Sequence, residues 1–132
     1  MKKRIYISLC VSGILVAVLT SVLVMGAVYG GFRKEAMGFL QNQGAIISDH
    51  MAYSPKNQID YLAGLKDDLH NLRLTLIEPD GKVLYDSFMN AGAMENHANR
   101  AEVKKARESG QGKAIRYSGT LGAETYYYAK LL

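Results

Sequence analysis

The sequence predicts an α+β protein in which a transmembrane helix continues into a long helix and is followed by an antiparallel sheet with flanking helices. Three observations lead to this prediction. No charged residue occurs from Ile5 to Phe32, and apolar residues then recur at helical spacing as far as Tyr53. After Leu72, strand-like segments come in two pairs, each joined by a turn that contains glycine. Antiparallel strands segregated from helices are typical of the α+β class.

The apolar segment 5–32 is long enough to cross a bilayer, because a helix needs about 20 apolar residues to span the hydrocarbon core. Basic residues at positions 2–4 favour a cytoplasmic N-terminus. A cleaved signal peptide is the alternative, but its apolar core spans about 7–15 residues and ends at a small-x-small site, which Val28-Tyr29-Gly30 matches poorly. We expect a cytoplasmic stub at 1–4, a transmembrane helix at 5–32 and an outer domain at 33–132.

The charge of the outer domain is nearly balanced. All 12 acidic residues and 13 of the 16 basic residues follow Phe32, which leaves a net charge of +1 on this part of the chain. Nucleic-acid binding calls for a clustered basic face, so we expect no nucleic-acid partner. The one cysteine, Cys10, lies in the apolar segment, and the outer domain therefore contains no thiol to form a disulfide or to bind a metal. We expect no cofactor and no metal.

Residues 33–53 predict a helix with a wide apolar surface. One stripe, spaced by three and four residues, comprises Met37, Leu40, Gly44, Ile47 and Met51, of which the four apolar side chains are the seam candidates. An adjacent stripe comprises Ala36, Phe39, Ile46 and Tyr53. Two explanations stay open: the helix packs on the sheet of its own domain, or the first stripe is the seam of a parallel homodimer.

The next helix should begin at Ser54-Pro55, because serine is a favourable N-cap and proline is favoured at the first helical position. It should end near His70-Asn71. A hairpin should follow, in which segments 73–78 and 82–86 flank the tight turn at 79–81.

Asn99 and Glu102 have the spacing of a capping box and predict a short helix at 100–108. Segments 113–118 and 124–131 should then form a second hairpin. The last segment is apolar, strongly β-forming and runs to the end of the sequence, where it would be an unprotected edge. We therefore expect the chain to be a C-terminally incomplete fragment of a longer protein.

Three segments of the second half carry a family resemblance: Arg73–Ser87, Met94–Val103 and Arg116–Gly122. They resemble the extracytoplasmic PAS-like sensor domain of bacterial histidine kinases, most closely the phosphate-regulon type. Ala101 stands where that family commonly has proline. The resemblance implies a PAS-like sheet and a signal-input region that forms a homodimer, with the chain anchored in the bacterial inner membrane and its domain outside the cytoplasm.

The resemblance also implies an output that this chain lacks. The full-length proteins of the family are ATP-dependent protein-histidine kinases, and a cognate response regulator would be a partner only through the missing kinase region. We expect no catalytic residue in these 132 residues. The alternatives are a stand-alone membrane-anchored binding or interaction protein, or the sensor domain of a chemoreceptor or cyclase.

A candidate ligand site lies on the second hairpin. Arg116 and Ser118 share one face of their strand, and Tyr126 and Tyr128 share a face of the next. Arginine and tyrosine beside a pocket can hold a carboxylate or another anion, so these four residues are candidates for binding a small molecule or peptide. The alternative is that an arginine stacks on a tyrosine across the strands without any ligand.

A second group of polar residues should structure the loops, because short polar side chains bond readily to nearby backbone groups. This group comprises Asp86, Ser87, Asn96, His97, Asn99 and Arg100. Glu95 and His97 are also a conceivable metal pair, but a catalytic zinc site needs about three protein ligands. The structural role is therefore favoured for His97.

Overall fold

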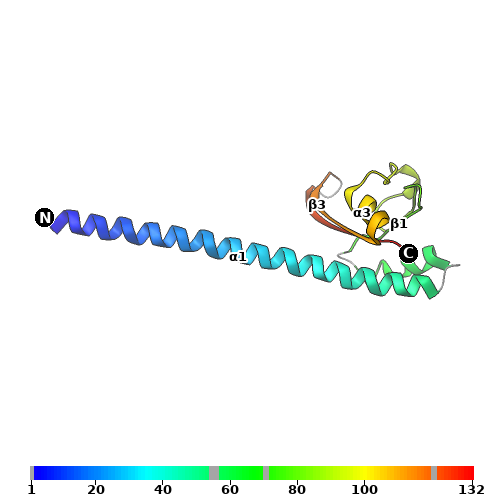
Figure 1. The fold of residues 1–132 in the computed structure, drawn as a ribbon, viewed down its shortest axis with the longest axis horizontal. Helices are drawn as coiled ribbons and strands as arrows, with labels where there is room; N and C mark the ends of the chain where they lie inside the picture. Colours follow the sequence, from blue (N-terminus) through cyan, green and yellow to red (C-terminus); the bar gives the residue numbers. More distant parts are fainter. Residues whose placement is uncertain (1, 54–56, 70–71, 120–121) are drawn as a thin grey trace. The chain divides into compact units, whose positions relative to one another are not determined.

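The computed structural model describes residues 2–53, 57–69, 72–119 and 122–132, and the chain divides into two compact units, Met1–Gly38 and Phe39–Leu132 (Figure 1). The predicted helix start at Ser54-Pro55 lies outside the described residues. The predicted end near His70-Asn71 is wrong, because the helix ends at Leu65 and the described residues 66–69 that follow it are not helical.

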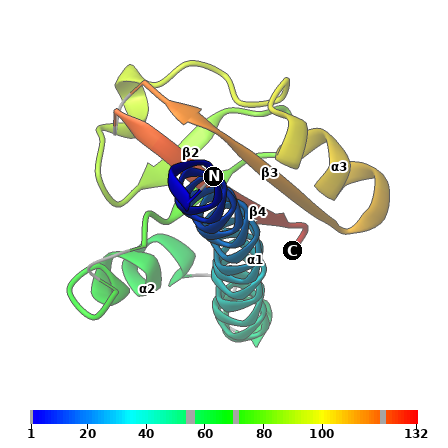
Figure 2. The same ribbon diagram turned by 90° about the vertical axis from the view of Figure 1, so that its left-hand side faces the viewer.

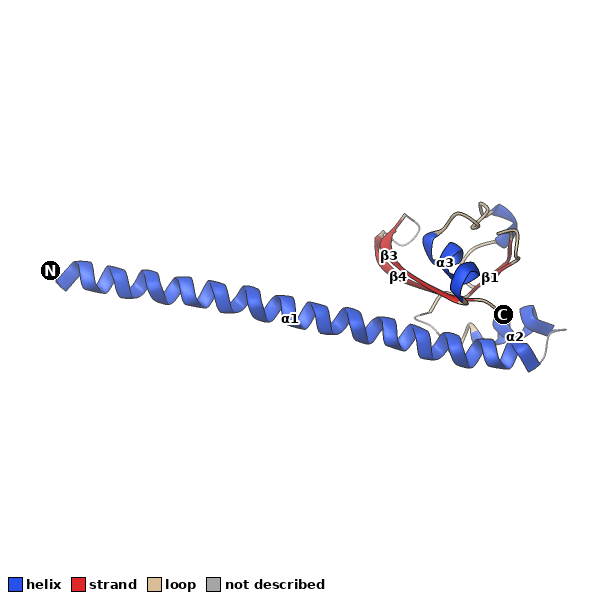
Figure 3. Ribbon diagram, viewed as in Figure 1, coloured by secondary structure: helices blue, strands red, loops and turns tan. Residues whose placement is uncertain are grey.

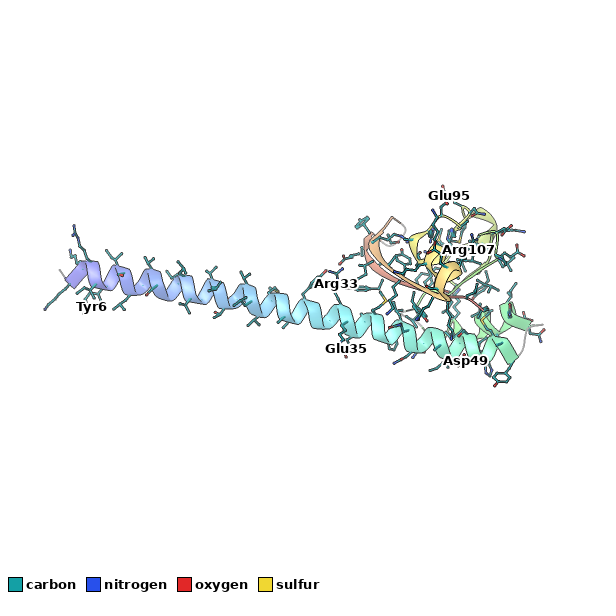
Figure 4. All side chains as sticks on the ribbon, in the orientation of Figure 1. Tyr6, Arg33, Glu35, Asp49, Glu95 and Arg107 are labelled. Atoms are coloured by element: carbon teal, nitrogen blue, oxygen red, sulfur yellow. The ribbon has the colours of Figure 1, made fainter. Side chains whose placement is uncertain are left out.

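Helix α1 (Lys2–Tyr53) is one continuous helix of 52 residues, which confirms the predicted continuation through 33–53. Its apolar side chains before Phe32 are exposed and project from the ribbon between the labelled Tyr6 and Arg33 (Figure 4). The helix contains a stretch that is long and apolar enough to cross a membrane, and a signal sequence near an N-terminus meets the same criteria.

The hydrophobic core of the second unit lies between the end of α1, helix α2 (Gln58–Leu65) and the first hairpin. Its buried residues are Ile47, Met51, Leu62 and Leu76. Two of the proposed seam residues, Ile47 and Met51, are therefore covered by their own chain, as the packing alternative expected. The other two, Met37 and Leu40, are half-buried.

The first hairpin, β1 (Thr75–Ile77) and β2 (Val83–Asp86), is antiparallel as predicted, with Thr75 opposite Asp86. A short 3₁₀ helix, η2 (Ala91–Ala93), follows it. The second hairpin, β3 (Gln111–Ser118) and β4 (Ala123–Lys130), is also antiparallel as predicted.

The expectation of one antiparallel sheet is wrong for the described residues, which form two separate two-stranded sheets (Figure 3). The segment between the hairpins folds back onto the turn of the first. The backbone N–H of His97 donates to the carbonyl oxygen of Gly81 at 2.8 Å, and Asn96 Nδ2 donates to that of Asp80 at 3.0 Å. The segment that links the two sheets is therefore tied to the turn of the first hairpin before α3 begins.

Helix α3 (Ala101–Ser109) matches the predicted range within one residue, but the predicted capping box is wrong. Arg100 is the N-cap residue, and no side chain caps it. Glu102 instead directs its carboxylate to Arg116 on β3, at 2.6 Å. A tertiary ion pair has replaced the local bond that the sequence pattern suggested.

Hairpin β3–β4 is held between α3 and the C-terminal part of α1 (Figures 1 and 2). On one face, a Cβ atom at Gly112 would overlap the backbone carbonyl of Glu102, so only glycine allows α3 to approach β3 this closely. On the other face, a Cβ atom at Gly44 would lie 2.6 Å from the ring of Tyr128. Each face of this small sheet thus lies against a helix at these positions.

We expect Gly112→Ala to lower the free energy of unfolding by about 2 kcal/mol, because the new methyl group must push α3 away from β3. Urea unfolding of the whole chain in neutral-detergent micelles, followed by tyrosine fluorescence, would measure the change. Gly119→Ala is the matched control, since a Cβ atom there meets nothing within 4 Å. Equal unfolding midpoints for the two variants would contradict the close contact.

Candidate functional site

A cavity of about 300 Å³ lies where the segment before β1, the start of α3 and the end of β3 meet. Its lining includes Arg73, Arg100, Arg116, Tyr117, Ser118 and Tyr127. We call it the arginine pocket, because three guanidinium groups from separate elements converge on it.

Arg73 is anchored by the buried carboxylate of Asp86, to which its Nε donates at 2.8 and 3.0 Å. The same carboxylate accepts bonds from Thr75 Oγ1 at 2.7 Å and from the backbone N–H groups of Phe88 and Met89, each at 2.9 Å. Burial raises the pKa of Asp86, but these hydrogen bonds outweigh it and lower the pKa below its ordinary value. Asp86 thus stays charged and joins the first hairpin to the loop that follows.

Arg116 is held from two sides. Its Nη1 donates to Glu102 at 2.6 Å, and its guanidinium carbon lies 3.8 Å from the centroid of the Tyr127 ring. Burial lowers the pKa of Arg116, but the hydrogen bond and the negative charge of Glu102 outweigh it and raise the pKa. The stacking of an arginine on a tyrosine, expected as the alternative to ligand binding, therefore occurs, with Tyr127 as the aromatic partner.

The register of the hairpin sorts the four predicted ligand-site residues. Arg116 and Ser118 line the pocket, whereas Tyr126 and Tyr128 belong to the opposite face of β4. The pairing of the two strands explains this arrangement. Arg116 pairs with Thr125, and Tyr127, two residues further along β4, therefore lies on the same face of the hairpin as Arg116. The combination of Arg116 with Tyr126 and Tyr128 in one site is therefore corrected to Arg116 with Tyr127.

Arg100 carries the charge that the pocket does not neutralise. Three guanidinium groups face two paired carboxylates, and among the described residues no carboxylate lies within 4.0 Å of the Arg100 guanidinium. Burial and the positive charges of Arg116 and Arg73 lower the pKa of Arg100, although Glu102 opposes this effect. The pocket therefore has a net positive charge that attracts anions.

Three of the six predicted loop residues, Asp86, Ser87 and Asn96, bond to the backbone through their side chains. The ring nitrogens of His97 have no hydrogen-bond partner among the described residues, and this residue is tied down only by its backbone N–H and carbonyl groups. Ser87 closes the first hairpin, since its N–H donates to Leu74 O at 2.9 Å and its Oγ accepts from Leu74 N at 3.0 Å. Asn96 Oδ1 accepts from Ala98 N at 2.8 Å. Asn99 is exposed, and Arg100 lines the pocket. Arg73 and Tyr127 were not among the predicted site residues. Arg73 stands two residues before Thr75 and therefore on the same face of the hairpin as Asp86, which pairs with Thr75.

The face of β4 away from the arginine pocket contacts α1. Tyr128 lies against Gly44, and its hydroxyl donates to Gln111 Oε1 at 3.2 Å. Lys130 Nζ lies 3.6 Å from a carboxylate oxygen of Asp49, whose place on α1 is labelled in Figure 4. Neighbouring residues of one strand therefore touch the pocket and the long helix.

His97 is only 2% exposed, whereas Glu95 is exposed at the outer edge of the loop (Figure 4). Within the described ranges, no group of three histidine, cysteine or acidic side chains is placed to hold a metal. Burial and the positive charge of Arg100 lower the pKa of His97, while the Glu95 backbone and the Asp86 charge oppose them.

We expect the stability of the second unit to fall as the pH drops below about 6.5, because the unfolded chain then binds a proton at His97 that the folded chain resists. The loss should reach at most about 1.4 kcal/mol per pH unit and should level off once the folded state also binds the proton. Urea midpoints between about pH 5 and 7.5 for the wild type and His97→Gln would show it, since glutamine does not titrate in that range. Parallel curves for the two proteins would refute this role of His97.

Comparison with known proteins does not place the chain in a family. No protein-family model matches it, and neither a curated protein nor a solved structure does. Its function must therefore be inferred from the pocket, from strand β4 and from the sequence pattern.

Proposed function

We propose that this chain is the signal-input region of a bacterial two-component sensor histidine kinase. In this proposal, segment 5–32 spans the inner membrane with the N-terminus in the cytoplasm, and residues 33–132 lie outside. The observation that carries the proposal is the position of β4, where Tyr127 lines the arginine pocket and the next residue, Tyr128, contacts α1 beside Gly44.

Strand β4 provides a physical route from a ligand to the membrane. Successive side chains of a strand point to opposite faces, so a ligand that displaces Tyr127 also moves the backbone that carries Tyr128. Tyr128 and Lys130 contact α1 at Gly44 and Asp49, and α1 is one helix from Lys2 to Tyr53. A shift at this contact would be transmitted along the helix, which is the kind of small interface movement that switching proteins use.

The family resemblance of segments 73–87, 94–103 and 116–122 supports a PAS-like sensor with its kinase and response regulator reached through a longer parent protein. A stand-alone membrane-anchored binding protein, a chemoreceptor sensor and a cyclase sensor would have the same input geometry with another output. The resemblance favours the kinase among these outputs.

Sequencing the coding DNA beyond codon 132 tests the output directly. We expect the frame to continue into a further strand, a second apolar span and an autokinase region. A stop codon after Leu132 would refute the kinase proposal for this protein and leave the stand-alone binding protein. Continuation into a cyclase or a chemoreceptor signalling region would show that the sensor has that output instead of a kinase.

In this proposal the chain works as a parallel homodimer, with its seam on α1 away from the core. Ile47 and Met51 are buried in their own chain, so the seam shifts to the neighbouring stripe of Phe39, Ile46 and Tyr53. These three side chains are 50%, 63% and 89% exposed and recur every seven residues, the repeat that keeps one face of a helix toward its partner in a coiled coil.

Cysteine crosslinking in membranes would test this seam. In a Cys10→Ser background, we expect Phe39→Cys and Ile46→Cys to give disulfide-linked dimers under mild oxidation, because each residue would face its own copy. Glu108→Cys, on the exposed surface of α3, is the matched control and should stay largely monomeric. Equal crosslinking at positions 39, 46 and 108 would argue against a specific seam.

A further inference from the structure

The arginine pocket has hydrogen-bond donors that are not bonded to any described residue. Arg73 donates through Nε to Asp86 and through Nη2 to Met94 Sδ at 4.0 Å, which leaves its Nη1 without a bond to any described residue. The guanidinium of Arg100 likewise donates to none of the residues that the structure describes. A guanidinium carries five N–H donors, and their planar fork matches the two oxygens of a carboxylate or phosphoryl group.

One positive charge of the pocket, that of Arg100, is not balanced by a carboxylate of the described residues. Asp86 and Glu102 neutralise Arg73 and Arg116, and Arg100 remains half-buried beside them without a carboxylate of its own in the described part of the chain. A partly buried charge without a counter-ion is unfavourable, because it has lost part of its hydration. An anion that enters the pocket would relieve this cost and would meet donors already fixed by Asp86 and Glu102.

The size of the pocket limits the ligand. Its volume of about 300 Å³ is at the lower end of the range for small-molecule sites, about 300–1,000 Å³. One wall is the Tyr127 ring stacked on Arg116, and Ser118 adds a polar group near the end of β3. The space suits a small polar anion better than a peptide or a lipid.

We infer that the arginine pocket binds a small oxyanion, a carboxylate or phosphoryl group, with Arg100 as its main charge partner and Arg73 as a second donor. This names the ligand class of the proposed sensor and rests on that proposed function for its role in signalling. The binding chemistry itself depends only on the three guanidinium groups and their two carboxylate partners.

Isothermal titration calorimetry on the whole chain in neutral-detergent micelles, in an amine buffer with chloride as the counter-ion, would test the inference. The probes are inorganic phosphate, acetate and succinate. We expect saturable binding of at least one probe, weakened at least about tenfold by Arg100→Gln and partly restored by Arg100→Lys, which keeps the charge without the fork. Lys105→Gln removes an exposed positive charge from α3 and should change the affinity by less than about twofold.

The relative affinities for the probes distinguish the two chemical classes of oxyanion. Preference for phosphate would assign a phosphoryl ligand, and preference for acetate or succinate would assign a carboxylate. Absence of saturable binding to the wild type, or equal weakening by Arg100→Gln and Lys105→Gln, would overturn the inference. If Arg100→Gln does not fold, Arg100→Lys takes its place. Weaker binding to Arg100→Lys than to Lys105→Gln would then support the inference, and equal binding to the two variants would overturn it.

The binding test and the test of the kinase proposal fail independently. A chain that binds no oxyanion but whose reading frame enters an autokinase loses only the ligand assignment. A chain that binds phosphate or a carboxylate through Arg100 but ends at Leu132 loses only the kinase output.

Discussion

Glu102 is the residue on which the arrangement of the second half of the domain depends. Its backbone carbonyl lies against Gly112, which sets how closely α3 approaches β3, and its carboxylate holds Arg116 at 2.6 Å. Together these contacts fix the start of α3, and therefore place Arg100 in the lining of the pocket. Arg116 is in turn positioned to stack on Tyr127. The backbone contact determines the packing, and the ion pair determines the electrostatics of the same small region.

Much of the fold follows from local patterns in the sequence. The apolar period of 33–53, the turn at 79–81 and the alternation around the second turn each predict their element within a few residues. These signals are local because backbone hydrogen bonding and side-chain periodicity are decided over a few neighbouring residues. Contacts between elements are a different matter. The spacing of Asn99 and Glu102 satisfies a capping box, yet the carboxylate gains more from a half-buried arginine 14 residues away.

The residues of the arginine pocket likewise differ in whether a local sequence pattern predicts them. Arg116 and Ser118 are recognisable from the strand pattern, and Tyr127 follows once the register is counted from the turn. Arg73 and Arg100 come from other elements, and only the tertiary fold brings them to the same cavity. The polar loop between the hairpins also closes through contacts that no local pattern specifies, such as the bond from His97 N–H to Gly81 O.

The burial of Ile47 and Met51 has a consequence for how the protein can be processed. These residues belong to α1, yet they complete the core together with Leu62 and Leu76. The helix is therefore part of the domain that it would anchor, and the two cannot be separated without loss. A protease that cut after Tyr53 would release a fragment whose apolar interior is open to water, and this fragment would be prone to aggregation and degradation. Cleavage between Phe32 and Phe39 would leave that interior covered, because Ile47 and Met51 would stay with the released fragment. The position of the cut would therefore determine whether the fragment stays folded.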